Sequence, residues 1–151
     1  KQLHPFFERE IKRFKYLRVH ACEKKLEREV RGIRLAGVLD RIDMTVDGLE
    51  VLDYKSGKYM TYTLKTLEGA KDFQLEFYYL LASTLGDVNN CGFYDLNNGK
   101  IVYEPVLTEK LDKLYSVLDE LRETKHFDFE MTEKFSDCSY CEYAYFCQRG
   151  L

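Results

Sequence analysis

The chain has 151 residues, a length that fits one domain and is sufficient to bury a real core. With 45% hydrophobic residues, 32% charged residues and two prolines, its composition excludes disordered and fibrous proteins. No apolar run approaches the roughly 20 residues of a membrane span, and no apolar segment of a secretory signal follows Lys1. These features predict a globular, cytoplasmic domain without membrane association.

The net charge of −3 does not by itself indicate a nucleic-acid-binding protein. Basic residues outnumber acidic ones between residues 8 and 31, whereas acidic residues outnumber basic ones between residues 104 and 137. One end of the molecule could therefore face phosphates, although two ordinary solvated faces explain the pattern equally well. Because the sequence begins with Lys1 rather than Met, directly before a predicted helix, we expect it to be a segment of a longer protein.

The first half of the chain predicts one helix and three strands. The helix runs from about Pro5 to about Tyr16, and its apolar residues recur at helical spacing: Phe6, Phe7, Ile11, Phe14 and Leu17. Strands are expected over residues 19–30, 33–46 and 49–54. Asp47-Gly48 is a strong two-residue hairpin signal between the second and third strands.

The second half predicts a helix from about Leu64 to about Leu85, with an apolar stripe formed by Phe73, Phe77, Leu80, Leu81 and Thr84. Strands over 91–96 and 101–106 follow, joined by a turn at Asn98-Gly99. Thr108 is expected to cap a last helix, whose stripe is Leu111, Leu114, Tyr115, Leu118 and Leu121. The order of elements predicts a mixed α/β domain that ends in a cysteine-rich tail.

Acidic residues stand at matching places in the second and third predicted strands. Asp40 follows Gly37-Val38-Leu39, and Asp53 and Lys55 end the next strand. Residues two apart in a strand project from the same face, so Asp53 and Lys55 point the same way, and the hairpin can bring Asp40 beside them. Two carboxylates and a backbone carbonyl such as that of Tyr54 form a hard oxygen site, which Mg²⁺ or Mn²⁺ prefers.

Such a site suits phosphodiester hydrolysis, because a divalent metal polarises the phosphoryl oxygen and activates water. Lys55 could stabilise the developing charge, or orient or deprotonate the attacking water. An ordinary ion pair between Asp40 and Lys55 is the simpler explanation of any isolated Asp-x-Lys spacing. The ion-pair explanation is less favoured here, because a second acidic strand and a helix bearing Gln74 and Tyr78 occur in the right order.

The sequence resembles the RecB-like branch of the PD-(D/E)XK nucleases, in particular the C-terminal nuclease domain of AddB-type helicase–nuclease subunits. The motifs that carry the resemblance are Gly37-x-x-Asp40-Arg41-Ile42-Asp43, Leu52-Asp53-Tyr54-Lys55-Ser56-Gly57 and Gln74-x-x-x-Tyr78. It implies a restriction-endonuclease-like core, with a central mixed five-stranded sheet flanked by helices. It also implies metal binding by Asp40, Asp53 and the Tyr54 carbonyl, and catalytic roles for Lys55, Gln74 and Tyr78.

By the same resemblance, residues 1–135 form the nuclease core and residues 136–151 a cluster-binding tail. Glu23 resembles an acidic strand position of the family, with an uncertain role. The family also carries a metal-binding His on an upstream helix, which we expect before Lys1. His4 and His20 are the candidates within the chain, although a lone His is more often an ordinary surface residue.

Three of the five cysteines lie in the last fourteen residues: Cys138, Cys141 and Cys147. An odd number and close spacing favour a metal or cluster in a reducing compartment over disulfides. Zinc and iron–sulfur both suit the spacing, and the resemblance to AddB-type nucleases implies a [4Fe–4S] cluster. Cys22 and Cys91 are expected to be small buried hydrophobes, so the fourth ligand is expected upstream of the chain.

The resemblance implies a DNA exonuclease module of an AddAB/RecBCD-type helicase–nuclease, which acts in double-strand-break repair by recombination. A helicase partner subunit and single-stranded DNA or duplex ends would be its partners, and Tyr59 and Tyr62 could stack on bases or pack in the core. A stand-alone RecB-like exonuclease of the CRISPR-associated type is the enzymatic alternative. An inactive nuclease fold that holds DNA or a partner is the non-enzymatic one.

Overall fold

The computed structural model describes residues 3–126 and 131–149. One sheet dominates the fold, and its five strands lie in the order β1-β2-β3-β4-β5. The elements are α1 (His4–Arg13), β1 (Arg18–Val30), β2 (Ile33–Thr45), β3 (Gly48–Lys55), α2 (Gln74–Ala82), β4 (Val88–Asp95), β5 (Lys100–Tyr103) and α3 (Leu107–Glu123), with short 3-10 helices at Leu67–Gly69 and Phe135–Cys138.

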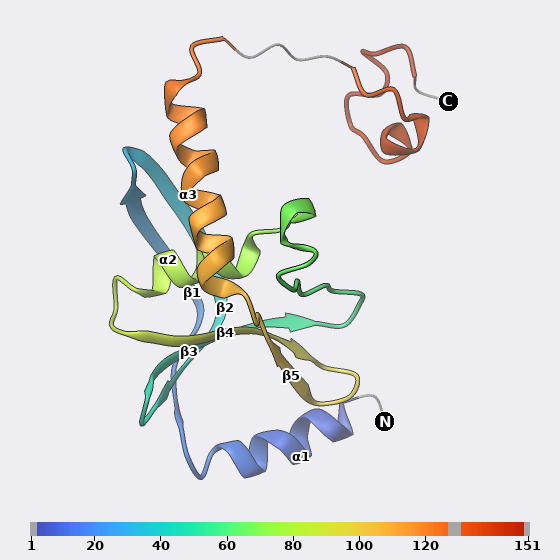
Figure 1. Ribbon diagram of the computed structural model, residues 1–151. Coiled ribbons are helices and arrows are strands. Elements are labelled where there is room, and N and C mark those ends of the chain that lie inside the picture. The colour runs from blue at the N-terminus through green and yellow to red at the C-terminus, as the bar shows by residue number, and fades with distance from the viewer. Residues whose placement is uncertain (1–2, 127–130, 150–151) are drawn as a thin grey trace.

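The sheet is mixed, because β3 and β4 run parallel while the other neighbouring strands pair antiparallel. Helix α2 lies on the connection between the two parallel strands, as a crossover requires. Figure 1 shows α1 on one side of the sheet and α2 and α3 on the other. The predicted mixed five-stranded sheet flanked by helices is therefore confirmed.

The main core fills the space between the sheet and helices α2 and α3. The strands contribute Leu39, Ile42, Val51 and Phe93, and the helices contribute Leu75, Leu80, Leu81, Leu114 and Leu118. Gly37 makes room for this packing, since a Cβ there would lie 3.1 Å from the Leu81 side chain. No helix in the described part of the chain is both long and apolar enough to cross a membrane.

A hairpin joins β2 and β3 as predicted, but its two turn residues are Val46 and Asp47, one position earlier than the Asp47-Gly48 signal indicates. Thr45 pairs with Gly48, whose φ of 127° lies in the region that glycine tolerates. A Cβ at Gly48 would also lie 2.7 Å from the backbone oxygen of Asp87. The hairpin therefore fixes the register that places the end of β3 beside β2.

The helix predicted over residues 64–85 is wrong in its first half, because α2 begins only at Gln74. Upstream, Thr63 and Thr66 bond to each other's backbone and hydroxyl groups, which offers this segment an alternative to the helical hydrogen-bond pattern. Asp72 then accepts the N–H of Gln74 at 2.9 Å. As a result Gln74 stands in the first turn of the helix, beside the end of β3.

Two expectations for the other helices also need correction. Thr108 lies inside α3 rather than at its cap, because the helix already begins at Leu107. Helix α1 turns Glu10 and Arg13 toward the sheet, where they find charged partners, and most of its apolar residues, though not Phe6, face outward. Phe7, Ile11 and Phe14 are accordingly 56%, 69% and 55% exposed.

Candidate active site

The predicted acidic residues meet where β3 ends. Asp53 is 3% exposed, and Asp40 is half-buried on the neighbouring strand β2. The Tyr54 N–H donates a 2.9 Å hydrogen bond to Asp40 Oδ2, which ties the two strands together just beyond their last registered pair, Arg41 and Leu52. Asp40 and Asp53 thus lie at one end of the hairpin, as the sequence predicts.

Lys55 pairs with Asp53 rather than with Asp40. Its Nζ atom lies 2.8 Å from Asp53 Oδ2 and donates a 2.9 Å hydrogen bond to Gln74 Oε1. The same ammonium lies 5.2 Å from the centre of the Phe93 ring. The simple Asp40–Lys55 ion pair is therefore not what the structure forms.

Gln74 and Tyr78 reach the site from one flank of α2. Gln74 Nε2 donates hydrogen bonds to Asp53 Oδ1 at 2.7 Å and to the Tyr78 hydroxyl at 3.2 Å. The Tyr78 hydroxyl in turn lies 3.3 Å from Asp53 Oδ1, to which it donates. The helix therefore fixes the orientation of both Asp53 and Lys55 through one amide side chain.

Burial shifts the acid–base properties of this cluster. Burial raises the pKa of Asp53, and nearby Asp40 reinforces the rise, while Lys55 and Tyr78 oppose it. Burial also raises the pKa of Tyr78 to about 12, so its hydroxyl remains protonated at neutral pH. A bound cation would stabilise the ionised form of such a buried carboxylate.

The donor set fits a divalent metal. Asp53 Oδ2 is buried and accepts no hydrogen bond from the described residues, although Lys55 lies close to it as an ion-pair partner. Carboxylate oxygens of this kind are the ligands that Mg²⁺ and Mn²⁺ prefer. In residues 3–126 and 131–149, however, no three His, Cys, Asp or Glu side chains converge as a metal site. Asp40 and Asp53 are therefore the two carboxylates that this site could offer to such a metal.

The two histidine candidates for a further ligand lie away from this cluster, whereas Glu23 lies near it. His4 is on α1, 3.8 Å from Glu8, and His20 is an exposed residue of β1. Glu23 lies between the registered pairs Cys22–Arg41 and Lys24–Leu39, a position opposite Asp40. Its φ of 48° is left-handed, which is uncommon for a strand residue and marks a local break in β1 beside the site.

The two tyrosines proposed for base stacking are engaged in packing. Tyr62 is 4% exposed and belongs to a small core with Ala70 and Val106. Tyr59 packs against Phe93 with ring centres 5.3 Å apart. The core explanation therefore holds for Tyr62, and stacking on DNA by its ring is excluded.

The cysteine-rich tail forms a small unit of its own beyond α3 (Figure 1). Cys138, Cys141 and Cys147 line one cavity of about 280 Å³, together with Arg149. The Arg149 guanidinium lies 3.8 Å from Cys138 Sγ. All five cysteines are free, and Cys22 is exposed, against our expectation, because it lies on the edge strand, whereas Cys91 is buried as predicted. The last residues of the predicted tail, 150 and 151, lie outside the described residues.

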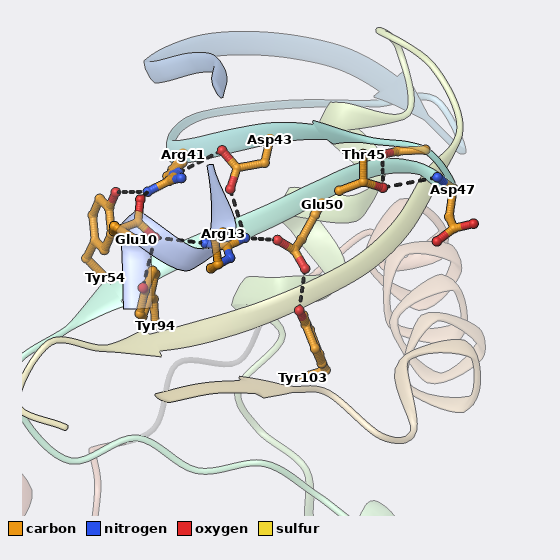
Figure 2. Close-up of polar contacts among 11 residues, drawn as sticks. Glu10, Arg13, Arg41, Asp43, Thr45, Asp47, Glu50, Tyr54, Tyr94 and Tyr103 are labelled. Carbon is orange, nitrogen blue, oxygen red and sulfur yellow. Dashed lines mark hydrogen bonds and ion pairs between the residues drawn. The ribbon is translucent and has the colours of Figure 1, made fainter. Parts of the chain in front are cut away.

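A charged network that the sequence patterns did not predict lies between α1 and the sheet, as Figure 2 shows. Its charged members are almost fully buried: Glu10, Arg13, Arg41, Asp43 and Glu50. The signal was present, because Arg41 and Asp43 belong to the motif around Asp40, and Glu50 interrupts an apolar strand. Burial alone would lower the pKa of Arg41, but its hydrogen-bonded partners Asp43, Tyr54 and Glu10 raise it, so the guanidinium stays charged.

A second buried ionic cluster supports the start of α2. Lys110 of α3 lies 2.9 Å from Glu76 and 3.0 Å from Glu104, and it stands over the Tyr62 ring at 4.7 Å. Glu104 also accepts the N–H of Tyr62. This cluster joins α2, α3 and the long loop before α2, so it holds the segment from which Gln74 projects.

The comparison with protein families agrees with this geometry. Residues 1–148 match the family model described as the PD-(D/E)XK nuclease superfamily. No curated protein matches the sequence significantly. The match covers nearly the whole chain, including every residue of the cluster around Asp53.

Proposed function

Because the chain belongs to the PD-(D/E)XK nuclease superfamily, we propose that it hydrolyses phosphodiester bonds of DNA at the cluster formed by Asp40, Asp53 and Lys55. The observation that carries the proposal is the convergence of these residues with Gln74 at the end of β3. Two carboxylates can hold a divalent metal, and an ammonium beside them can stabilise negative charge that develops on the phosphate, which suits metal-assisted phosphodiester hydrolysis.

Each residue has a defined role in this proposal. Asp40, Asp53 and the backbone carbonyl of Tyr54 would hold Mg²⁺ or Mn²⁺, which would supply polarisation of the phosphate and activation of water. Lys55 would donate its N–H groups to the phosphate oxygens as negative charge develops there. Gln74 and Tyr78 would keep Asp53 and Lys55 in place, since Gln74 donates to Asp53 and accepts from Lys55, and Tyr78 donates to Asp53.

More specifically, we propose an exonuclease of the RecB-like branch, acting as a module of an AddAB/RecBCD-type helicase–nuclease in recombinational repair. The three motifs around Asp40, Asp53 and Gln74 support this assignment by their resemblance to that branch. A single DNA strand or a duplex end would be the substrate, and a helicase subunit the partner. The free cysteines are consistent with a reducing, cytoplasmic location.

The tail would carry a [4Fe–4S] cluster in this proposal. Cys138, Cys141 and Cys147 supply three thiols around one cavity, which fits their use as cluster ligands. The cluster would have a structural role, holding the tail in a fixed conformation. An iron and sulfide assay on anaerobically purified protein distinguishes this cluster from zinc.

The nuclease assignment can be tested with end-labelled single-stranded and duplex DNA in Mg²⁺ or Mn²⁺. We expect cleavage by the wild type and its loss in Asp53→Ala and Lys55→Ala. Matched controls are Asp87→Ala and Lys58→Ala, which remove exposed groups of the same kind outside the cluster. Equal cleavage by Asp53→Ala, or a wild type inert on every substrate, would show that the proposal is wrong.

A further inference from the structure

Arg41 follows Asp40 directly but serves the opposite face of the sheet. Its guanidinium lies under α1, where Nε donates a 2.7 Å hydrogen bond to Asp43 Oδ1 and Nη1 donates to Glu10. Nη1 also donates a 3.2 Å hydrogen bond to the Tyr54 hydroxyl, as Figure 2 shows. Arg41 is 3% exposed, so these bonds are shielded from water. A buried guanidinium with several acceptors is a rigid anchor, because its donors lie in one planar fork.

Tyr54 is the residue through which this anchor reaches the candidate metal site. Its backbone N–H donates to Asp40, and its neighbours in the chain are Asp53 and Lys55. On the α1 side its ring packs against Phe6 and Tyr94, with ring centres 5.9 Å away in each case. Tyr54 is therefore held from both faces of the sheet, by Asp40 on one and by Arg41 on the other.

We propose that Arg41 is a positioning residue of the metal site, acting from the opposite face of the sheet through its hydrogen bond to Tyr54. Rotation of the Tyr54 peptide units would move the backbone on both sides of it, and with it the Asp53 and Lys55 side chains. It would also break the hydrogen bond that orients Asp40. The Arg41–Tyr54 bond restrains this rotation. The inference rests on the proposed metal site at Asp40 and Asp53.

The other half of the same network provides a control, because it stabilises the fold without a hydrogen bond to Tyr54. It joins Arg13 to Asp43 at 2.9 Å and to Glu50, and the Tyr103 hydroxyl donates to Glu50. This half also fastens α1 to the sheet but makes no bond to Tyr54. Tyr54→Phe and Tyr103→Phe thus each remove one hydroxyl from one buried network, and only the first removes a bond to the residue between Asp53 and Lys55.

Mn²⁺ binding distinguishes positioning from stability. We would measure the Mn²⁺ dissociation constant by electron paramagnetic resonance, and thermal unfolding without metal, for the wild type and both variants. Partners that orient metal ligands are typically worth 10–100-fold in affinity, so we expect Tyr54→Phe to weaken Mn²⁺ binding about tenfold. Tyr103→Phe should bind Mn²⁺ as the wild type does, whatever its melting temperature.

Arg41→Lys provides a second variant, which keeps the charge but loses the planar fork, and we expect it also to weaken Mn²⁺ binding. Unchanged Mn²⁺ affinity in Tyr54→Phe, an equal loss in Tyr103→Phe, or no binding by the wild type would overturn the inference. Its failure is distinguishable from failure of the nuclease proposal. If the wild type cleaves DNA but Tyr54→Phe binds Mn²⁺ as tightly as the wild type, the positioning role is wrong and the nuclease proposal is retained. If Tyr54→Phe binds Mn²⁺ more weakly but the wild type does not cleave DNA, the nuclease proposal is wrong and the positioning role is retained.

Discussion

Gln74 Nε2 donates a 2.7 Å hydrogen bond to Asp53 Oδ1, while the carbonyl oxygen of the same amide accepts a bond from Lys55. One neutral side chain therefore bridges the carboxylate and the ammonium of the candidate site. An amide can donate to the first and accept from the second, whereas a carboxylate cannot donate and an ammonium cannot accept. The bridge makes the first residue of α2 the link between the helix and the end of β3 that carries the candidate site.

Gln74→Ala should lower DNA cleavage about 10–100-fold, the range expected when a partner that orients a ligand is lost. Gln74→Glu should be at least as damaging, because a carboxylate cannot donate to Asp53 and adds negative charge beside it. Steady-state cleavage rates at saturating metal would show both effects. Asn89→Ala, which removes an exposed amide on β4, serves as the control. Wild-type rates in Gln74→Glu would rule out the bridging role.

Asp53→Asn should abolish cleavage and yet stabilise the fold. Burial raises the pKa of Asp53 above its unfolded value, so its ionised form destabilises the folded state as the pH rises through that raised pKa. Replacing the carboxylate by an isosteric amide removes this cost at neutral pH, with an expected gain of about 0.5–2 kcal/mol.

Urea unfolding at pH 7 and at about pH 4, near the ordinary pKa of Asp, tests whether Asp53→Asn raises the free energy of unfolding. The stability advantage of Asp53→Asn over the wild type should shrink at the lower pH, because the wild-type carboxyl is then protonated. Asp87→Asn, on an exposed residue, should show no advantage at either pH. A destabilised Asp53→Asn variant at pH 7 would contradict the argument.

Bound Mn²⁺ should make the wild type more stable than Asp53→Asn, the reverse of the order expected without metal. A ligand that binds only the folded state adds about 2.7 kcal/mol at a concentration 100 times its dissociation constant. We therefore expect Mn²⁺ to raise the melting temperature of the wild type and EDTA to remove the gain. Asp53→Asn and Asp40→Asn should lose most of the response, since each lacks one carboxylate ligand. An equal rise in all three proteins would indicate that Mn²⁺ binds elsewhere.

The sequence predicts the residues of the candidate site better than it predicts the buried ionic contacts and the start of α2 that hold them in place. The period of two in β3 and the hairpin signal before it were sufficient to place Asp53, Lys55 and Asp40 together, because these are local signals, although the turn lies one residue earlier than predicted. The spacing of Gln74 and Tyr78 correctly placed both on one flank of α2.

Long-range ionic pairing could not be predicted in the same way. Glu10 and Arg13 of α1 look like surface charges among apolar neighbours, and only the folded sheet shows that their partners are Arg41, Asp43 and Glu50. The late start of α2 was also hidden, since the Thr63–Thr66 bonds that replace a helical turn depend on local geometry rather than on hydrophobic periodicity.

Lys110→Met should destabilise the fold strongly. The Lys110 ammonium pairs with both Glu76 and Glu104, which are 0% and 6% exposed. Removing one partner of a buried ionic cluster leaves charge without compensation and typically costs about 3–5 kcal/mol. Methionine preserves most of the side-chain volume, so the loss should reflect charge rather than a cavity. Urea unfolding at pH 7 would measure it.

Lys113→Met is the matched control, because Lys113 lies one turn further along α3 and donates only to backbone oxygens, at 3.1 Å in the case of Leu67. We expect a loss of about 1 kcal/mol there, typical of one hydrogen bond. The deficit of Lys110→Met should also shrink as the pH falls, because burial raises the pKa of Glu76 and its protonation removes the uncompensated charge. Equal losses in the two variants, or a Lys110→Met deficit that does not change with pH, would show that the cluster contributes to stability by packing alone.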